Sequence, residues 1–154
     1  MNTQLIQKIF TSNAGLGALI LRVPLGIILM AHGAQKLFGL FGGYGLEGTG
    51  QFMESIGFAP GYLMALLAGS GEFFGGLALV LGLLTRPAAV VTAFTMFMAM
   101  TVHIGNGLFV TNNGYEYALL LAVTSVALIA QGAGAFSLDN KIAQRFQNNS
   151  KKTA

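Results

Sequence analysis

The chain has 154 residues, of which 54% are hydrophobic and only 8% are charged. A soluble domain usually carries about a quarter charged residues, so this chain lacks the side chains that a water-exposed surface needs, and we expect most of it to lie in a lipid bilayer. The net charge of +3 comes without any stripe of Lys, Arg and aromatic residues, which excludes a nucleic-acid partner. The absence of cysteine excludes disulfides, thiolate metal sites and cysteine-ligated iron–sulfur clusters on this chain.

Four segments are long and apolar enough to cross a bilayer, which takes about 20 residues for roughly 30 Å of hydrocarbon. The predicted spans are residues 14–37, 61–84, 87–104 and 115–135. The first is interpreted as an uncleaved span and not as a signal peptide, because Arg22 interrupts its apolar run and three more spans follow. The link before Pro87 is very short, which predicts that the second and third spans are antiparallel neighbours.

The connection between the first two spans is rich in glycine and then changes character. Phe52, Met53 and Ile56 recur at helical spacing within residues 49–58, which predicts a short interfacial or re-entrant helix. Residues 43–48 match G-x-G-x-x-G, but a dinucleotide-binding motif needs a strand before it and a helix after it. We therefore expect these glycines to shape a mobile loop over a cavity.

The predicted fold class is all-α, an integral membrane four-helix bundle with a short interfacial or re-entrant helix in the first outer loop. Residues 1–13 form its N-terminus, residues 14–136 its transmembrane domain, and residues 137–154 a polar, basic tail for which no helix is predicted. The tip of that tail is expected to be disordered.

Lys and Arg in the loops predict the orientation, because they are more frequent on the cytoplasmic side. One side of the predicted bundle carries six of them and the other only Lys36; the six are Lys8, Arg86, Lys141, Arg145, Lys151 and Lys152. Both termini are therefore expected on the cytoplasmic side of a bacterial plasma (inner) membrane. The loops 38–60 and 105–114 are expected to face outward.

Arg22 and Glu72 are ionisable residues inside predicted spans. Such a group costs about 2.5–3.5 kcal/mol on insertion scales and persists where it is paired or functional. We predict that the two side chains meet; the pair would either fix the helix register or hold Glu72 ionised beside a ligand. Gly71 and Gly75 form a small-xxx-small face next to Glu72, which indicates close helix packing within the bundle or between protomers.

The other ionisable candidates all lie at the predicted outer end of the spans: His32, Lys36, His103 and Glu116. His32 and Lys36 are four residues apart and therefore share one helix face. Each residue alone could be a headgroup anchor, but together they are expected to surround one outward-opening cavity above Glu72. Lys36 would attract anionic ligands at its mouth.

A cavity with these donors and acceptors in an apolar wall suits a quinone, a quinol or a related phenol. Quinone carbonyls accept hydrogen bonds, and a quinol needs a base. Glu72 and Glu116 would accept protons, and His32 and His103 would donate or relay them. A haem held by the two histidines and a zinc ion held by His32, His103 and Glu116 are weaker alternatives, so we expect no metal and no covalent cofactor.

Several segments together resemble the DoxX family of small four-span membrane proteins. They are Arg22, Gly26 and His32-Gly33-x-x-Lys36-Leu37; Gly50-x-Phe52 and Gly57-Phe58; Glu72-Phe73-Phe74-Gly75-Gly76 with Leu81-Gly82-Leu83-Leu84-Thr85-Arg86; and Gly134-Ala135-Phe136-Ser137-Leu138-Asp139. The resemblance implies the four-span fold. The family name has been attached to a small subunit of a thiosulfate:quinone oxidoreductase and to proteins linked with quinone or catechol stress.

The function favoured by these observations is quinone, quinol or phenol binding at an outward-facing site in support of redox conversion. No redox cofactor site is recognisable in the sequence, so the electrons would come from the quinone itself or from a soluble or membrane oxidoreductase partner. The chain would then be a quinone-linked oxidoreductase or a membrane subunit of one, and a homo-oligomer is left open. The alternatives are a non-catalytic membrane assembly subunit and a small transporter of a phenolic weak acid.

Overall fold

The computed structural model describes residues 11–12 and 14–152, and every regular element in this part of the chain is a helix. The predicted all-α class is therefore confirmed. The elements are α2 (Leu16–Phe38), η1 (Leu40–Gly42), α3 (Gly45–Ser55), α4 (Gly61–Leu81), α5 (Thr85–His103), η2 (Ile104–Asn106), η3 (Val110–Asn112), α6 (Glu116–Gln131) and α7 (Leu138–Lys152). Most of the predicted N-terminal segment 1–13, including Lys8, lies outside the described residues.

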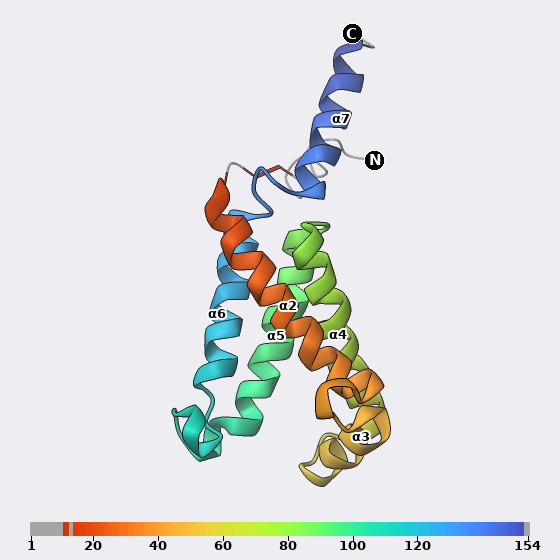
Figure 1. Ribbon diagram of the computed structural model, residues 1–154, viewed down its shortest axis with the longest axis vertical. Coiled ribbons are helices and arrows are strands. Elements are labelled where there is room, and N and C mark those ends of the chain that lie inside the picture. Colours follow the sequence, from red (N-terminus) through yellow and green to blue (C-terminus); the bar gives the residue numbers. More distant parts are fainter. Residues whose placement is uncertain (1–10, 13, 153–154) are drawn as a thin grey trace.

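Four long helices, α2, α4, α5 and α6, run along one another and form the bundle (Figure 1). Helix α3 and the loop that contains η2 and η3 lie at one end, called here the α3 end. The α4–α5 link and α7 lie at the opposite end, called the α7 end. Arg86, Lys141 and Arg145 belong to elements of the α7 end, whereas Lys36 is near the α3 end of α2.

Three segments have the length and composition of membrane spans: Leu16–Phe38, Gly61–Leu81 and Thr85–Asn106. The fourth apolar helix, α6, has only 16 residues, about 24 Å at 1.5 Å per residue. The predicted fourth span 115–135 was therefore too long. Helix α6 ends because Gly132 and Gly134 adopt left-handed φ angles of 74° and 79°, a backbone conformation that glycine reaches without a steric penalty.

Helices α2 and α4 pack closely through glycine. A Cβ atom added at Gly26 would lie 2.5 Å from the carbonyl oxygen of Gly76, and one added at Gly33 would lie 2.5 Å from the backbone nitrogen of Phe73. Gly75 instead faces Thr92 of α5. The expectation that glycines beside Glu72 allow close helix packing is thus confirmed, and the packing lies within the bundle.

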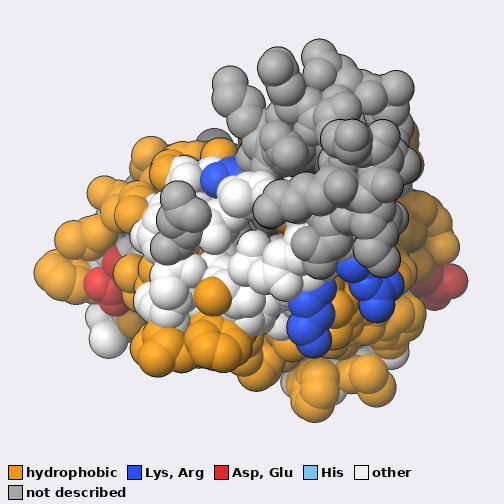
Figure 2. Space-filling view, turned by 90° about the horizontal axis from the view of Figure 1, so that it is seen from above, with side chains coloured by type: hydrophobic (Ala, Val, Ile, Leu, Met, Phe, Trp, Pro, Cys, Tyr) orange, Lys and Arg blue, Asp and Glu red, His pale blue; other side chains and the backbone are white. Residues whose placement is uncertain are grey.

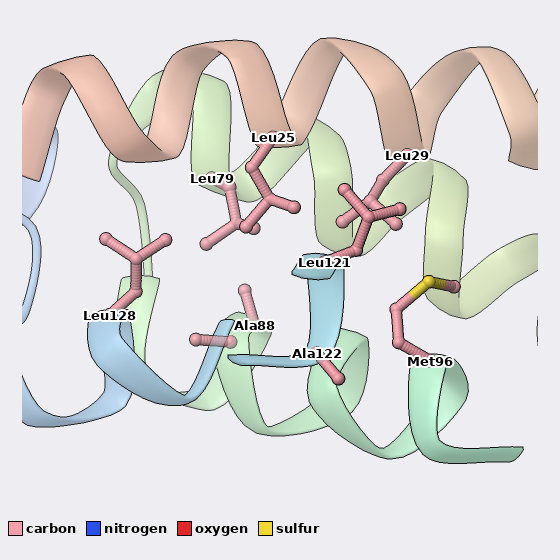
Figure 3. Packing of buried hydrophobic residues seen from close by; sticks show 9 residues of the cluster. Leu25, Leu29, Leu79, Ala88, Met96, Leu121, Ala122 and Leu128 are labelled. Carbon is pink, nitrogen blue, oxygen red and sulfur yellow. The ribbon is translucent and has the colours of Figure 1, made fainter. Parts of the chain in front are cut away.

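Small and aliphatic side chains form the core between these helices. Leu25 and Leu29 of α2 point toward Leu121 of α6, with Leu79 of α4 beside them (Figure 3). Helices α5 and α6 are also joined by a buried hydrogen bond of 3.1 Å from Thr92 Oγ1 to Ser125 Oγ. Large apolar side chains cover the outside of the bundle, as expected where the solvent is lipid (Figure 2).

Helix α3 begins earlier than predicted, at Gly45 and not near residue 49. Most of the G-x-G-x-x-G segment therefore forms its first turn, and the prediction of a mobile loop was wrong there. Gly43 allows the chain to pass close to α2, since an added Cβ atom would lie 2.4 Å from the carbonyl oxygen of Gln35. The carboxylate of Glu54 accepts a hydrogen bond from the backbone nitrogen of Gly61, so α3 caps the start of α4.

The basic tail forms α7 from Leu138 onward, although no helix was predicted there. Its first turn is joined to the α4–α5 link. Asp139 Oδ1 and Oδ2 accept hydrogen bonds of 2.7 and 2.8 Å from the backbone nitrogens of Leu84 and Thr85, and the Asp139 nitrogen donates to the carbonyl of Gly82. One carboxylate thus caps the N-terminus of α5, where backbone N–H groups lack helical partners.

Candidate functional site

An ion pair inside the bundle joins Lys36 of α2 to Glu72 of α4. Lys36 Nζ lies 2.6 Å from Glu72 Oε2, and Glu72 is only 3% exposed. The predicted pair of Arg22 with Glu72 is therefore wrong. Lys36, which was expected to attract ligands at the mouth of a cavity, is 25% exposed and supplies the counter-charge of the buried carboxylate.

Close packing of α2 against α4 makes this contact feasible. A Cβ atom added at Gly69 would lie 2.8 Å from a methyl carbon of Leu37 and 3.2 Å from the Cβ of Lys36. The absence of a side chain at Gly69 therefore allows the Lys36 stem to lie directly on the α4 backbone. Glu72 is one turn further along α4, within reach of the ammonium group.

His32 adds a second basic group to this contact. It lies one helical turn before Lys36, and its charge would interact electrostatically with Glu72. Its ring also contacts the ring of Tyr117 on α6, with 5.9 Å between the centroids and 57° between the planes. Three helices therefore contribute to a group of Lys36, Glu72, His32 and Tyr117, which we call the Lys36–Glu72 site.

Tyr117 and the ring contacts of Phe73 were not recognised from the sequence. Phe73, the neighbour of Glu72, makes edge-to-face contacts with Phe38 and with Phe74, each with 5.3 Å between centroids. The position of Tyr117 directly after Glu116 was the available signal. Aromatic side chains thus come from each of the three helices that contribute to the Lys36–Glu72 site.

His103 and Glu116 make a different set of contacts. His103 Nδ1 lies 2.9 Å from the carbonyl oxygen of Asn113, and Glu116 Oε1 accepts a 2.7 Å hydrogen bond from the backbone nitrogen of Val110. Both side chains therefore stabilise the loop between α5 and α6. Among the interactions of the described residues, neither is bonded to Lys36, Glu72 or His32.

In residues 11–12 and 14–152, no group of three or more His, Asp or Glu side chains is arranged to hold a metal ion. An open hollow of about 600 Å³ does lie at the α3 end, but it is formed by α3 and the start of α4. Its lining residues are Glu47, Gly50, Gln51, Glu54, Ser55 and Tyr62.

Arg22 lies at the α7 end of the bundle, is 1% exposed, and binds backbone carbonyls. Its Nη1 donates to the carbonyls of Leu79 and Val80 at 2.8 and 2.6 Å, and its Nε donates to Ala133 at 3.1 Å. Its Nη2 donates to the carbonyl of Phe136. The carbonyls near a helix C-terminus carry partial negative charge, so the guanidinium finds its compensation there and not at Glu72.

Arg22 and Asp139 make the α7 end a second polar centre. Asp139 is close enough to interact electrostatically with Arg22, while its carboxylate caps α5. Arg86 donates to the carbonyls of Ile129 and Thr11 at 3.2 and 3.1 Å. These contacts join the start of the first span, the α4–α5 link and the segment after α6.

Comparison with known proteins identifies one family. The family model described as DoxX matches residues 17–104, which include Arg22, Lys36 and Glu72. "Putative oxidoreductase CatD" of Bacillus subtilis (strain 168) is 37% identical over 124 residues, covering 80% of this chain and 85% of the relative. "Inner membrane protein YqjF" of Escherichia coli (strain K12) is 32% identical over 131 residues, covering 84% of this chain and 95% of the relative.

A third relative, an uncharacterized protein of Haemophilus influenzae (strain ATCC 51907 / DSM 11121 / KW20 / Rd), is 39% identical over 106 residues, covering 62% of this chain and 79% of the relative. No solved structure matches the chain. The family match covers more than half of the chain, and the apolar helices agree with a membrane location. The chain therefore belongs to the DoxX family of membrane proteins.

Proposed function

We propose that this protein binds a quinone, a quinol or a related phenol at the Lys36–Glu72 site and supports its redox conversion together with a partner oxidoreductase. The observation that carries the proposal is the ion pair of Lys36 with the buried Glu72, with His32 close enough to interact with the carboxylate and the ring of Tyr117 against His32. Ionisable side chains within a membrane span are energetically costly, and they commonly mark functional sites. The oxidoreductase name of CatD supports the same class of chemistry.

The side chains fit the needs of such a ligand. The Lys36 ammonium can donate a hydrogen bond to a quinone carbonyl, because it has three N–H groups and Glu72 Oε2 occupies one of them. Glu72 can accept a phenolic proton, and His32 can relay it because imidazole both donates and accepts. Phe38 and Phe73 offer apolar contact for the ring.

The redox step divides between two proteins in this proposal. Oxidation of a quinol releases two electrons and two protons, and reduction of a quinone takes up the same number. The Lys36–Glu72 site would handle the protons. The electrons would pass to or from the cofactor of the partner oxidoreductase, which places this chain in the role of a quinone-binding membrane subunit.

The test is binding of a short-chain quinone analogue to the purified protein, compared with its Lys36→Met, Glu72→Gln and His32→Ala variants. We expect each variant to bind at least about tenfold more weakly, since one lost hydrogen bond to a charged group is worth about 1.5–3 kcal/mol. His103→Ala is the matched control, because His103 bonds to the loop carbonyl of Asn113.

Thermal melting in detergent should show that all four variants are folded. Binding that is equal in the wild type and all variants would refute the proposal. It would favour the non-catalytic assembly subunit, which needs no ligand at this position. Selective loss in His103→Ala alone would move the ligand to the loop between α5 and α6.

A further inference from the structure

Helix α7 carries an apolar stripe outside the membrane-spanning segments. Leu138, Ile142 and Phe146 follow one another at intervals of four residues and therefore share one face. Leu138 is 37% exposed and Phe146 is 45% exposed, and Phe136 just before the helix is 62% exposed. A contiguous group of exposed large apolar side chains marks a surface that binds a protein or a membrane.

Positive charge accompanies this stripe. Lys141 and Arg145 are both exposed and also lie four residues apart, about 100° around the helix from Ile142 and Phe146. The sequence contains no acidic residue after Asp139, whereas Lys151 and Lys152 add two further cationic residues. The exposed part of α7 therefore presents positive charge alone, directly beside its apolar face.

The attachment of α7 places its first turn close to the ends of the membrane-spanning helices. Over the described residues, the hydrogen bonds between α7 and the bundle come from its first turn, from Asp139 to the α4–α5 link and from Asn140 to Ala135. Helix α7 points away from the four long helices (Figure 1). Its stripe therefore reaches the headgroup layer, which is about 5–8 Å thick on each side of a bilayer, when the helix tilts about this first turn.

We propose that α7 docks on the adjacent membrane surface, where its stripe enters the acyl boundary and Lys141 and Arg145 bind the phosphates of anionic phospholipids. A helix with an apolar face and flanking Lys and Arg binds in the interface through apolar burial together with attraction to anionic lipids. An acidic protein would offer the same charge. The membrane is favoured because the first turn of α7 is tied to the ends of two spans and three large apolar side chains extend from that point.

The chain has no tryptophan, so Phe146→Trp supplies a single fluorescent probe on the proposed docking face. The full-length variant is placed in nanodiscs of phosphatidylcholine alone or of phosphatidylcholine mixed with anionic phosphatidylglycerol. We expect blue-shifted emission and quenching by brominated acyl chains in the anionic discs. Unchanged emission in the two kinds of disc, without quenching, would overturn the proposal.

Charge-removal variants decide whether the basic residues act in docking. Lys141→Gln and Arg145→Gln, each in the Phe146→Trp background, should reduce the ratio of docked to undocked helix roughly fivefold per charge removed. Salt at about 1 M, where the Debye length is about 3 Å, should have the same effect. Gln147→Asn in that background is the neutral control and should keep the response of the Phe146→Trp variant.

Addition of soluble polyglutamate to phosphatidylcholine discs separates the two sources of negative charge. No spectral change with polyglutamate, together with the shift in phosphatidylglycerol, supports the lipid surface. A shift with polyglutamate and none with phosphatidylglycerol would overturn the proposal in favour of an acidic protein partner. Melting in detergent checks that the tryptophan variant is folded, and Phe136→Trp offers a second probe of the same surface.

Discussion

Arg22 is held by four backbone carbonyl oxygens, two at the C-terminal end of α4 and two in the segment after α6. The last carbonyls of a helix have no partner within the helix. A planar guanidinium with five N–H groups can bind several of them at once. A single side chain of the first span thus joins two distant parts of the chain.

Replacement of Arg22 should therefore destabilise the protein strongly. We expect Arg22→Gln to lower the free energy of unfolding by about 3 kcal/mol or more, because hydrogen bonds to charged groups contribute about 1.5–3 kcal/mol each. Arg22→Lys should recover only part of this loss, since an ammonium cannot reproduce the guanidinium fork. Melting in detergent measures both. Arg145→Gln is the control, because Arg145 is exposed; a control that melts as early as Arg22→Gln would contradict this account.

Double-mutant cycles should separate the two buried centres. Lys36→Met and Glu72→Gln should be coupled by about 0.5–3 kcal/mol, because their side chains are in contact. Arg22→Gln and Glu72→Gln should be additive within about 0.5 kcal/mol, since Leu79, which binds Arg22, lies about 10 Å along α4 from Glu72. Unfolding in denaturant, measured for the single and double variants, gives the free energies of unfolding for both cycles. Coupling between Arg22→Gln and Glu72→Gln would contradict the conclusion that these two residues belong to separate centres.

The ionisable residues of the site could be selected from the sequence, but their partners could not. Arg22 and Glu72 were recognisable because each is a charge in an apolar span. A backbone carbonyl has no sequence signature, so the hydrogen-bond partners of Arg22 could not be identified from the sequence. Lys36 was assigned to the rim by its place near the helix end, because the space that Gly69 leaves for its stem appears only once α2 and α4 are packed. Tyr117 was missed for the same reason.

At the scale of elements, the crossing of α2 and α4 depends on positions where no side chain fits. Gly26 and Gly76 approach so closely that a Cβ atom on either would meet the backbone of the other helix at 2.5–2.6 Å. The contact between Lys36 and Glu72 lies further along the same two helices. The proposed redox site is therefore sensitive to packing at Gly26 and Gly76, which lie about three turns from Lys36 along α2 and about one turn from Glu72 along α4.

A pair of glycine substitutions on α2 tests this dependence. Gly26→Ala should destabilise the fold by about 1–3 kcal/mol, because overpacking forces the helices apart. Gly17→Ala should be neutral or stabilising by up to about 1 kcal/mol, because its Cβ would meet nothing within 4 Å and alanine favours a helix. Both are measured by thermal melting in detergent. Equal melting temperatures for the two variants would show that the crossing tolerates a methyl group.

The cap on α5 comes from α7, and its removal should loosen both helices. Asp139→Ala leaves two backbone nitrogens of the α4–α5 link without their carboxylate partner. Loss of an N-cap costs about 0.5–2 kcal/mol. We expect a lower melting temperature and faster proteolysis within α7. The neighbouring Asn140→Ala is the control, since Asn140 makes a long side-chain bond of 3.4 Å to Ala135; wild-type behaviour of Asp139→Ala would argue against the cap.

The elements themselves were predictable to the extent that hydrophobicity defines them. Three spans were located to within a few residues because long apolar runs have few alternatives. The fourth span was predicted to continue beyond the end of α6. Gly132, Ala133 and Gly134 are apolar enough to extend a predicted span, although the two glycines end the helix. Helix α7 was missed because its polar composition resembles an unstructured tail, and Asp139 acts as its anchor only in the folded bundle.

For the whole molecule, the bundle separates the described basic residues between its two ends. Arg86, Lys141 and Arg145 are in elements of the α7 end, and the first described residues are joined to the same end, where Ser12 Oγ donates to the carbonyl of Gln131. The first described residues and α7 therefore share one end of the molecule (Figure 1). This arrangement is compatible with an even number of membrane crossings.

The orientation of the bundle remains a prediction from the distribution of charge. A reporter active only in the cytoplasm should be active when fused after Ala154 and inactive when inserted within residues 105–114. A reporter active only outside the cytoplasm should give the opposite pattern. Activity of the cytoplasmic reporter within residues 105–114, with none after Ala154, would reverse the orientation.

The carbonyl partners of Arg22 also impose an order on biosynthesis. Ribosomes make Arg22 early, whereas Leu79 follows 57 residues later and Ala133 follows 111 residues later. The first helix is therefore made before these partners exist, and an Arg at the centre of a span costs about 2.5–3.5 kcal/mol on insertion scales. The environment of the first span is complete only when the last segment has emerged. A chain released before residue 133 would leave its opening helix exposed to membrane quality control.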